Sequence, residues 1–245
     1  MVERRERDFA GEVLRNLLLR GADVRGGAIT ECRLRGVDLW DLQIDGELRN
    51  VLVNGVDIAP LVEAELDRRD PDRAKMRPET PAGFREAWTI LEGRWAATLE
   101  SARALPEHRL HEPVDDEWSF VQTLRHLCFA TDAWVARMVL GDPSPWHPLD
   151  LPWDEAPGWE GVPWDREVRP SLGEVLAVRA ERQGMVRRLL ADLTDEQLTS
   201  TVTRTEPGWP VLEDFPVKEC LLTVLNEEWQ HRLYAERDLA ALHAR

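Results

Sequence analysis

The chain carries a glutamate and a histidine four residues apart in a segment that we expect to be helical. Glu227 and His231 lie in the sequence LNEEWQHRLYAERDL, residues 225 to 239, which contains no Gly or Pro. Residues four apart project from the same face of a helix, so the carboxylate and the imidazole are neighbours. Apolar residues cover the first half of this helix, and a buried carboxylate must be hydrogen-bonded, paired or bound to a cation.

A histidine in an earlier helical segment is a candidate partner for this pair. His126 lies in TLRHLCFATDAW, and its neighbours on the same helix face are small apart from Phe129. A histidine that faces a pair spaced i, i+4 on another helix can place three ligands on one face of a divalent cation. His126, Glu227 and His231 are thus candidate ligands, whose side chains should converge on one point.

Two other interpretations of these residues stay open. Glu227 can instead form a buried ion pair with Arg125 or His126 in a protein that holds no metal. Glu228 lies three residues before His231 and can take the place of Glu227 as the ligand.

Two aromatic residues are further candidates for the site. Tyr234 lies one turn beyond His231 and is a candidate catalytic group, either as a proton donor or as a hydrogen-bonding partner of a ligand, with simple packing as the alternative. Trp118 precedes a predicted helix start, where its ring can wall the mouth of the site and contact a cofactor, or can merely pack.

The remaining histidines and cysteines give weaker signals. We expect His108 and His111 to be surface residues, although their i, i+3 spacing can bind a metal. The three cysteines have no CxxC spacing, which argues against a disulfide framework and against a cysteine zinc site. We expect Cys128 and Cys220 to fill the core.

Four segments with helical periodicity must position these side chains. They run from about 82 to 104, 119 to 141, 171 to 193 and 217 to 243. Their lengths predict a mainly α protein built on a four-helix bundle, with no strands between the helices. The connection after the second helix, residues 142 to 170, is rich in tryptophan and proline. Such a loop is either a structured lid or a segment packed on the side of the bundle.

The first 67 residues follow a different pattern. Apolar residues recur every five positions, which is the period of neither a helix nor a strand: Val24, Ile29, Leu34, Leu39 and Ile44. This rhythm resembles the pentapeptide-repeat family, whose chain winds into a square β-helix with an apolar residue pointing inward, although it covers only about one coil. Asn54-Gly55 predicts a hairpin. We predict a small β-rich unit over 1–67, a linker over 68–81 and the bundle over 82–245.

The helical part resembles the DinB-like superfamily, which includes thiol-dependent S-transferases and maleylpyruvate isomerases. The resemblance covers about residues 82 to 245 and rests on helix order, the long second connection and the segments EWSF..TLRHL and LNEEWQHRLYAERDL. The usual ligands of that family are three histidines, two of them spaced HxxxH. Here Glu227 takes the place of the first histidine of that pair, so the resemblance implies the ligands His126, Glu227 and His231. Two histidines and a carboxylate suit zinc, nickel, manganese or iron(II).

The resemblance implies a metal-dependent enzyme that carries out thiol S-transfer or thiol-dependent isomerisation on a small electrophile. A low-molecular-weight thiol such as mycothiol would be the second substrate. The carboxylate ligand also suggests an alternative, an iron(II) oxygen-dependent enzyme. A third interpretation is a non-catalytic binding or scaffold protein whose N-terminal unit docks a partner.

The composition of the chain limits the expected classes of binding partner and the expected cellular location of the protein. The formal net charge of −15 disfavours binding to nucleic acid or to an anionic membrane surface, so small molecules are the expected partners. The sequence contains no apolar run long enough for a bilayer, and its first residues, MVERRERDF, are charged where a secretory signal is apolar. We predict a cytoplasmic location.

Overall fold

The computed structural model describes residues 8–14, 19–22, 24, 29–154 and 156–245. The chain divides into two compact units, Met1–Glu47 and Leu48–Arg245. It is mainly helical, with two small antiparallel sheets in the described residues. No helix in this part of the chain is long and apolar enough to cross a membrane. The division at residue 47 differs from the expected one at residue 67, because the first hairpin and the first helix belong to the second unit.

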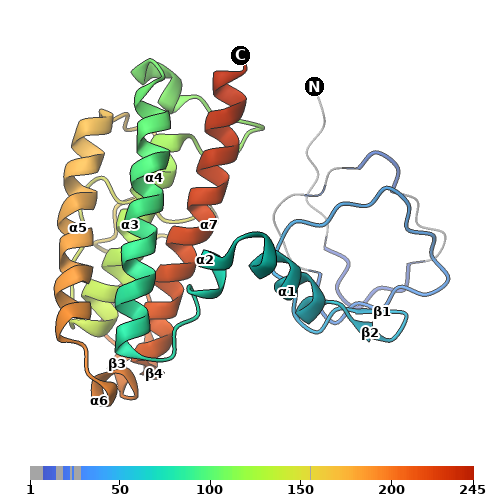
Figure 1. Ribbon diagram of the computed structural model, residues 1–245, viewed down its shortest axis with the longest axis horizontal. Helices are drawn as coiled ribbons and strands as arrows, with labels where there is room; N and C mark the ends of the chain where they lie inside the picture. Colours follow the sequence, from blue (N-terminus) through green and yellow to red (C-terminus); the bar gives the residue numbers. More distant parts are fainter. Residues whose placement is uncertain (1–7, 15–18, 23, 25–28, 155) are drawn as a thin grey trace. The chain divides into compact units, whose positions relative to one another are not determined.

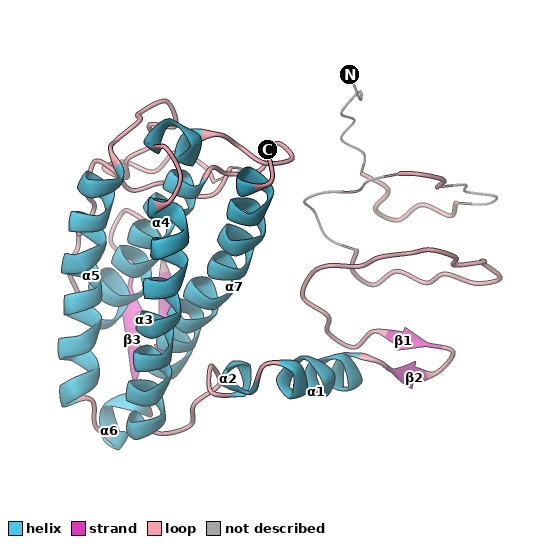
Figure 2. Ribbon diagram, turned by 45° about the horizontal axis from the view of Figure 1, so that its top comes forward, coloured by secondary structure: helices cyan, strands magenta, loops and turns pink. Residues whose placement is uncertain are grey.

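The described residues of the first unit run in wide loops and form no strand (Figure 2). The left-handed backbone conformation follows the five-residue period, at Gly21, Glu31, Gly36 and Asp41. The five apolar residues of the rhythm, however, are 53% to 85% exposed rather than buried. The predicted inward position of these apolar residues is therefore wrong, since a short coil has no neighbouring coil to cover them. The β-rich unit over 1–67 stays a prediction. Residues 23 and 25–28 of this stretch lie outside the described residues.

A hairpin and two short helices open the second unit. Strands β1 (Leu52–Val53) and β2 (Val56–Asp57) pair around Asn54-Gly55, which confirms the predicted hairpin. Both turn residues have positive φ, as a tight turn between paired strands requires. Helices α1 (Ala59–Arg69) and α2 (Pro71–Ala74) follow, and Asp70 caps α2. Part of the expected linker is thus helical.

Four long helical segments lie side by side in the second unit (Figure 1). They are α3 (Pro81–Arg103), α4 (Phe120–Thr131) with its continuation η2 (Asp132–Val139), α5 (Leu172–Asp192) and α7 (Val217–His243). Helices α3 and α4 each pack against both α5 and α7. Ser119 and Ser171 cap α4 and α5 through capping boxes, so the helix starts agree with the sequence-based prediction.

The second long segment changes its helical geometry at Asp132. From this residue to Val139 the backbone forms a π-helix, in which hydrogen bonds reach one residue further along the chain than in an α-helix. The prediction of a helix over about 119–141 is confirmed for residues 120–139. The sequence did not distinguish the two helical geometries, because the apolar pattern of eight residues is similar in both. Asp132, at the junction, is buried.

Short elements connect the long helices. They are η1 (Glu107–His111), α6 (Asp195–Leu198) and the antiparallel strands β3 (Thr201–Arg204) and β4 (Leu212–Pro216). The β3–β4 hairpin corrects the prediction that no strands lie between the helices. Arg137 of η2 donates hydrogen bonds to the carbonyl oxygens of Glu206 and Pro210, at 2.6 and 3.1 Å. These bonds fix the hairpin loop against η2.

The apolar core lies between the long helices in two clusters. One includes Phe84, Trp88 and Trp229, and the other includes Trp95 and Leu124. Each large apolar side chain that is fully buried contributes about 1.5–3 kcal/mol to the free energy of folding. This packing fixes α4 against α7, and these two helices carry the predicted site residues.

Candidate metal centre

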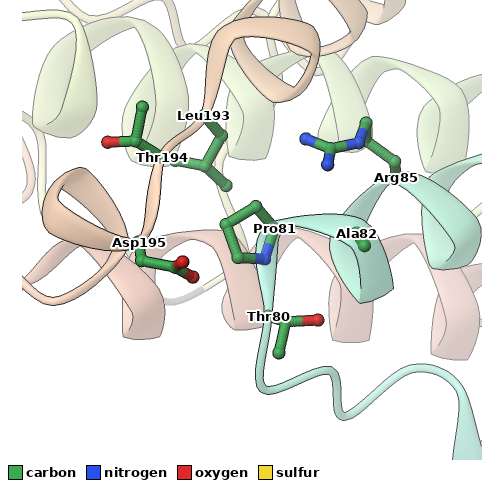
Figure 3. Close-up of a pocket in the computed structure, with 7 residues that line it drawn as sticks. All are labelled: Thr80, Pro81, Ala82, Arg85, Leu193, Thr194 and Asp195. Carbon is green, nitrogen blue, oxygen red and sulfur yellow. The ribbon is translucent and has the colours of Figure 1, made fainter.

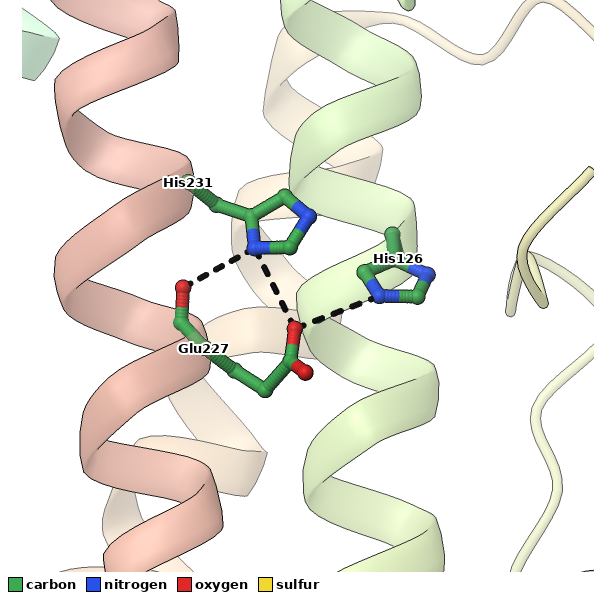
Figure 4. A group of neighbouring side chains, drawn as sticks. All are labelled: His126, Glu227 and His231. Carbon is green, nitrogen blue, oxygen red and sulfur yellow. Dashed lines mark hydrogen bonds and ion pairs between the residues drawn. The ribbon is translucent and has the colours of Figure 1, made fainter. Parts of the chain in front are cut away.

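Three side chains from two helices converge at one place (Figure 4). His126 lies in the middle of α4, and Glu227 and His231 lie one turn apart on α7. Each residue offers one ligand atom, and these atoms lie within 4.8 Å of one another. The structure thus brings together all three predicted ligands. Among the described residues, no other group of three such side chains is close enough to share a cation.

The carboxylate of Glu227 is at the centre of this triad. Its Oε2 atom lies 3.4 Å from Nε2 of His126 and 3.2 Å from Nδ1 of His231. These contacts are longer than the 2.7–2.9 Å or so of a charge-assisted hydrogen bond. Oε2 is buried, and no described residue aligns a hydrogen-bond donor with it. Burial raises the pKa of Glu227, but the two histidines lower it by more, so the group is ionised. A buried carboxylate oxygen in this situation fits a cation.

The loop after η2 fixes the ring of His126. Nδ1 of His126 lies 2.9 Å from the carbonyl oxygen of Leu151, a contact in which the ring N–H donates. A proton on Nδ1 leaves the lone pair of a neutral imidazole on Nε2, the nitrogen that faces Glu227. Metal-binding histidines commonly have such a partner on the second nitrogen.

His231 is held by its own helix. Its Nδ1 lies within hydrogen-bonding distance of the main-chain oxygen of Glu227, at 3.0 Å. This bond directs the ring along α7 toward the carboxylate, and 18% of the side chain is exposed. The imidazole of His231 is therefore more exposed than that of His126, whose side chain is 8% exposed.

The structure decides between the alternatives for the two neighbouring glutamates. Glu228 is buried on another face of α7 and pairs with Arg179 of α5 at 2.9 Å, so it is not the ligand. Arg125 donates to three carbonyl oxygens, including that of Leu149 at 2.7 Å, so Arg125 is not the partner of Glu227. The contact between Glu227 and His126 fits both a shared metal and an ion pair.

Trp118 lies over the two histidines. Its ring centroid is 4.6 Å from that of His126 and 6.0 Å from that of His231. The indole N–H donates to Asp154 Oδ1 at 2.7 Å, and Asp154 also pairs with Arg166. Residues of the long loop thus hold the ring of Trp118 in place. No sequence signal singled out Asp154.

Tyr234 lies at the outer edge of the triad. Its ring is edge-on to that of His231, with centroids 5.9 Å apart, and the side chain is 45% exposed. The guanidinium of Arg237 lies over the ring of Tyr234, 5.6 Å from its centroid. The catalytic role of Tyr234 stays a prediction.

The other histidines and cysteines take no part in the triad. His108 and His111 lie on η1 and are at least partly exposed. Cys128 and Cys220 are buried, as expected for core residues, and burial raises the pKa of both thiols. Neither thiol has the lowered pKa of a reactive cysteine.

An aromatic cluster extends from His126 along α4. Phe129 lies 6.0 Å from His126 between ring centroids, and it stacks on Trp146 of the long loop and on Trp209 of the β3–β4 hairpin. Trp153 packs edge-on against Trp209. Phe129 was visible in the sequence as a neighbour of His126. Trp209 was not, because it reaches the cluster only through the unpredicted hairpin.

Two surface pockets lie apart from the triad. One is between the start of α3 and the start of α6, and its lining includes Thr80, Arg85 and Asp195 (Figure 3). The other lies beside η2 and α5, with Asp132 and Arg182 in its wall. No triad residue lines either pocket.

The arrangement defines a class of site. Two imidazoles and one carboxylate from facing helices, with ligand atoms within 4.8 Å of one another, match the donor set of divalent transition-metal sites. A mainly helical protein that carries such a set between two packed helices is a candidate helical metalloprotein.

Comparison with known protein families identifies the family. Residues 90–235 match the DinB superfamily, and this range contains all three triad residues. The chain belongs to the DinB superfamily. Searches of curated proteins and of solved structures gave no significant match.

Proposed function

We propose that this protein is a metal-dependent enzyme, built on a DinB-like four-helix bundle, in which His126, Glu227 and His231 hold a divalent transition metal. The observation that carries the proposal is the position of Glu227 Oε2. This buried oxygen lies within 3.4 Å of nitrogens from both histidines and has no aligned donor among the described residues. Zinc, nickel, manganese and iron(II) all accept this donor set.

The proposed reaction is thiol S-transfer, or thiol-dependent isomerisation, on a small electrophile. A bound metal supplies Lewis acidity, which lowers the pKa of a coordinated thiol so that a nucleophile is available at neutral pH. Mycothiol is a candidate thiol. This assignment rests on the resemblance to the thiol-dependent branches of the superfamily.

The residues around the triad have proposed roles in this reaction. The indole of Trp118 covers the imidazoles of His126 and His231 and excludes water from that side. It is also a candidate contact for the thiol. The half-exposed Tyr234, beside His231, can exchange a proton with solvent and deliver it to the product.

The carboxylate in the triad supports an alternative function. Two histidines and one carboxylate are the ligands of many iron(II) enzymes that use oxygen. Glu227 is ionised in the protein and is close to both histidines. An iron(II) oxygen-dependent enzyme is therefore the second candidate.

Elemental analysis of the purified full-length chain tests the proposal. We expect one equivalent of transition metal in the wild type and a large loss in His231→Ala and Glu227→Gln. His108→Ala removes a histidine outside the triad and is the matched control, with full metal content expected. Absence of metal from the wild type after supplementation would contradict the proposal and favour a non-catalytic binding protein.

Activity assays separate the two enzymatic candidates. The metal-loaded chain is incubated with a panel of low-molecular-weight thiols and a generic electrophile, with and without a chelator. Metal-dependent thiol conjugation supports the first candidate. Oxygen consumption without conjugation supports the iron(II) alternative.

A further inference from the structure

A short segment of the long loop is bonded to α4 beside the triad. We call residues 147–151 the strap. The carbonyl oxygen of Leu149 accepts from Arg125 Nε at 2.7 Å, and the carbonyl oxygen of Leu151 accepts from His126 Nδ1 at 2.9 Å. Asp150, between them, is fully buried, and its Oδ2 accepts from the backbone N–H of His147. The strap thus sets the orientation of a proposed metal ligand.

The carboxyl group of Asp150 lies against a second buried carboxyl group. Asp132, at the start of η2, is also buried. Burial, then the charge of Asp132 and a hydrogen bond between the two side chains, raise the pKa of Asp150. Both oxygens of Asp132 already accept from Arg182 of α5, at 2.7 to 3.2 Å. Oδ1 of Asp150 is buried without a donor from the described residues. Two buried carboxyl groups therefore interact, and the guanidinium of Arg182 donates to Asp132.

The surrounding charges do not neutralise Asp150. The titratable and charged groups around the pair are Arg125 and Cys128 on α4, Arg182 on α5, and His147 in the strap, and Arg179 of α5 lies beyond them near Cys128. Arg182 is paired with Asp132, Arg179 is paired with Glu228, and Arg125 donates to carbonyl oxygens. Two buried carboxylates in contact cannot both ionise without a further cation. One of them must hold a proton.

We propose that Asp150 holds this proton, donates it in a hydrogen bond to Asp132, and in this form is a positioning residue for His126. The bond fixes the strap on η2, the continuation of α4. The fixed strap keeps the carbonyl oxygen of Leu151 against Nδ1–H, so Nε2 of His126 is directed at Glu227. The role of His126 as a ligand rests on the proposed function, whereas the effect of Asp150 on the ring can be measured without a metal.

The proposal has a pH dependence of definite sign. Burial, and then the neighbouring Asp132, raise the pKa of Asp150 well above its ordinary value. A raised pKa in the docked strap means that docking takes up a proton. The stabilisation of the docked strap by this hydrogen bond is therefore complete at low pH, and it is lost as the pH rises through the raised pKa of Asp150.

Three variants of the full-length chain test this inference. Asp150→Asn keeps a neutral donor toward Asp132 but cannot titrate. Asp150→Ala removes the donor. Glu160→Gln removes an exposed carboxylate from the same loop and is the matched control.

The first measurements use metal-free protein over a range of pH. They are the nitrogen chemical shifts of the histidine rings, which report the tautomer of His126, and the hydrogen exchange of the strap. We expect the Nδ1–H tautomer and a protected strap in the wild type, with both lost as the pH rises. Asp150→Asn should keep both at high pH, and Asp150→Ala should lose both at every pH.

Zinc titration by calorimetry at neutral pH is the second measurement. Loss of a residue that orients a metal ligand lowers affinity by about 10–100-fold, and we expect a decrease of this size in Asp150→Ala but not in Glu160→Gln. The inference would be overturned if Asp150→Ala kept the wild-type tautomer of His126 and the wild-type hydrogen exchange of the strap. It would also be overturned if these two quantities depended on pH in the same way in the wild type and in Asp150→Asn. A wild type that binds no zinc, yet shows the Asp150-dependent tautomer, would contradict the proposed function and support the positioning role.

Discussion

The carboxylate of Glu228 lies 2.9 Å from the guanidinium of Arg179, and both side chains are buried between α7 and α5. This pair gives the two consecutive glutamates of α7 different roles. Glu228 neutralises a buried arginine, and its neighbour Glu227 is left to face His126 and His231.

The first prediction concerns this ion pair. Glu228→Ala leaves Arg179 buried without its partner, which typically costs about 3–5 kcal/mol of the free energy of unfolding. Urea denaturation should show a loss of this size, whereas Glu219→Ala, at an exposed position on the same helix, should change stability little. A loss below about 1 kcal/mol would mean that solvent reaches Arg179.

The second prediction concerns the choice of metal. Glu227→His creates the three-histidine set that is usual in the resembled family. Imidazole suits zinc and nickel better than manganese, for which oxygen ligands are preferred. In competition experiments, the ratio of bound zinc to bound manganese should therefore rise in the variant. An unchanged ratio would argue that Glu227 is not a ligand.

The third prediction concerns access to the triad. Trp118→Ala removes the ring that lies 4.6 Å from the ring of His126, so EDTA should extract bound metal severalfold faster than from the wild type. Asp154→Ala removes the acceptor that holds the indole N–H and should act in the same direction, with a smaller effect. Trp40, 83% exposed in the first unit, provides the control variant Trp40→Ala. Equal extraction rates would show that Trp118 does not cover the metal.

The fourth prediction concerns the thiols of the chain. Cys32 is exposed, whereas Cys128 and Cys220 are buried, and burial raises the pKa of Cys220 to about 12. A thiol reagent such as DTNB should modify one cysteine in the native chain and all three after unfolding in urea. Cys32→Ala should abolish the native reaction. Rapid modification of Cys128 or Cys220 would instead reveal an open core, and the chain itself could then supply a reactive thiol.

The sequence alone predicted the long helices and the members of the triad. Helical periodicity is local, because each apolar stripe reports one buried face, and the serines before α4 and α5 mark their starts directly. The spacing of Glu227 and His231 requires only that α7 be helical, so their proximity was predictable. His126 was predictable as their partner because its neighbours on the same face of α4 are small apart from Phe129, which leaves room for a bound ion.

The tertiary structure decided what depends on contacts between distant segments. The sequence left Glu227 and Glu228 as alternative ligands, and the choice follows from the position of Arg179 on α5. The β3–β4 hairpin was missed because its short strands are held by Arg137 of η2 rather than by a strong local pattern. The apolar rhythm of the first unit predicted buried residues, and the structure leaves them exposed because burial in a coil depends on neighbouring coils.

The surroundings of His126 show most clearly what only the tertiary structure decided. The sequence shows Asp132 and Asp150 as ordinary acidic residues, one near a helix end and one in a proline-rich loop. Only the fold buries both carboxyl groups together and places Leu151 against the ring of His126. A periodic pattern records which face of an element is buried, whereas the pairing of buried polar groups depends on how separate elements pack. The sequence therefore determined the members of the triad, and the tertiary structure determined what holds them in place.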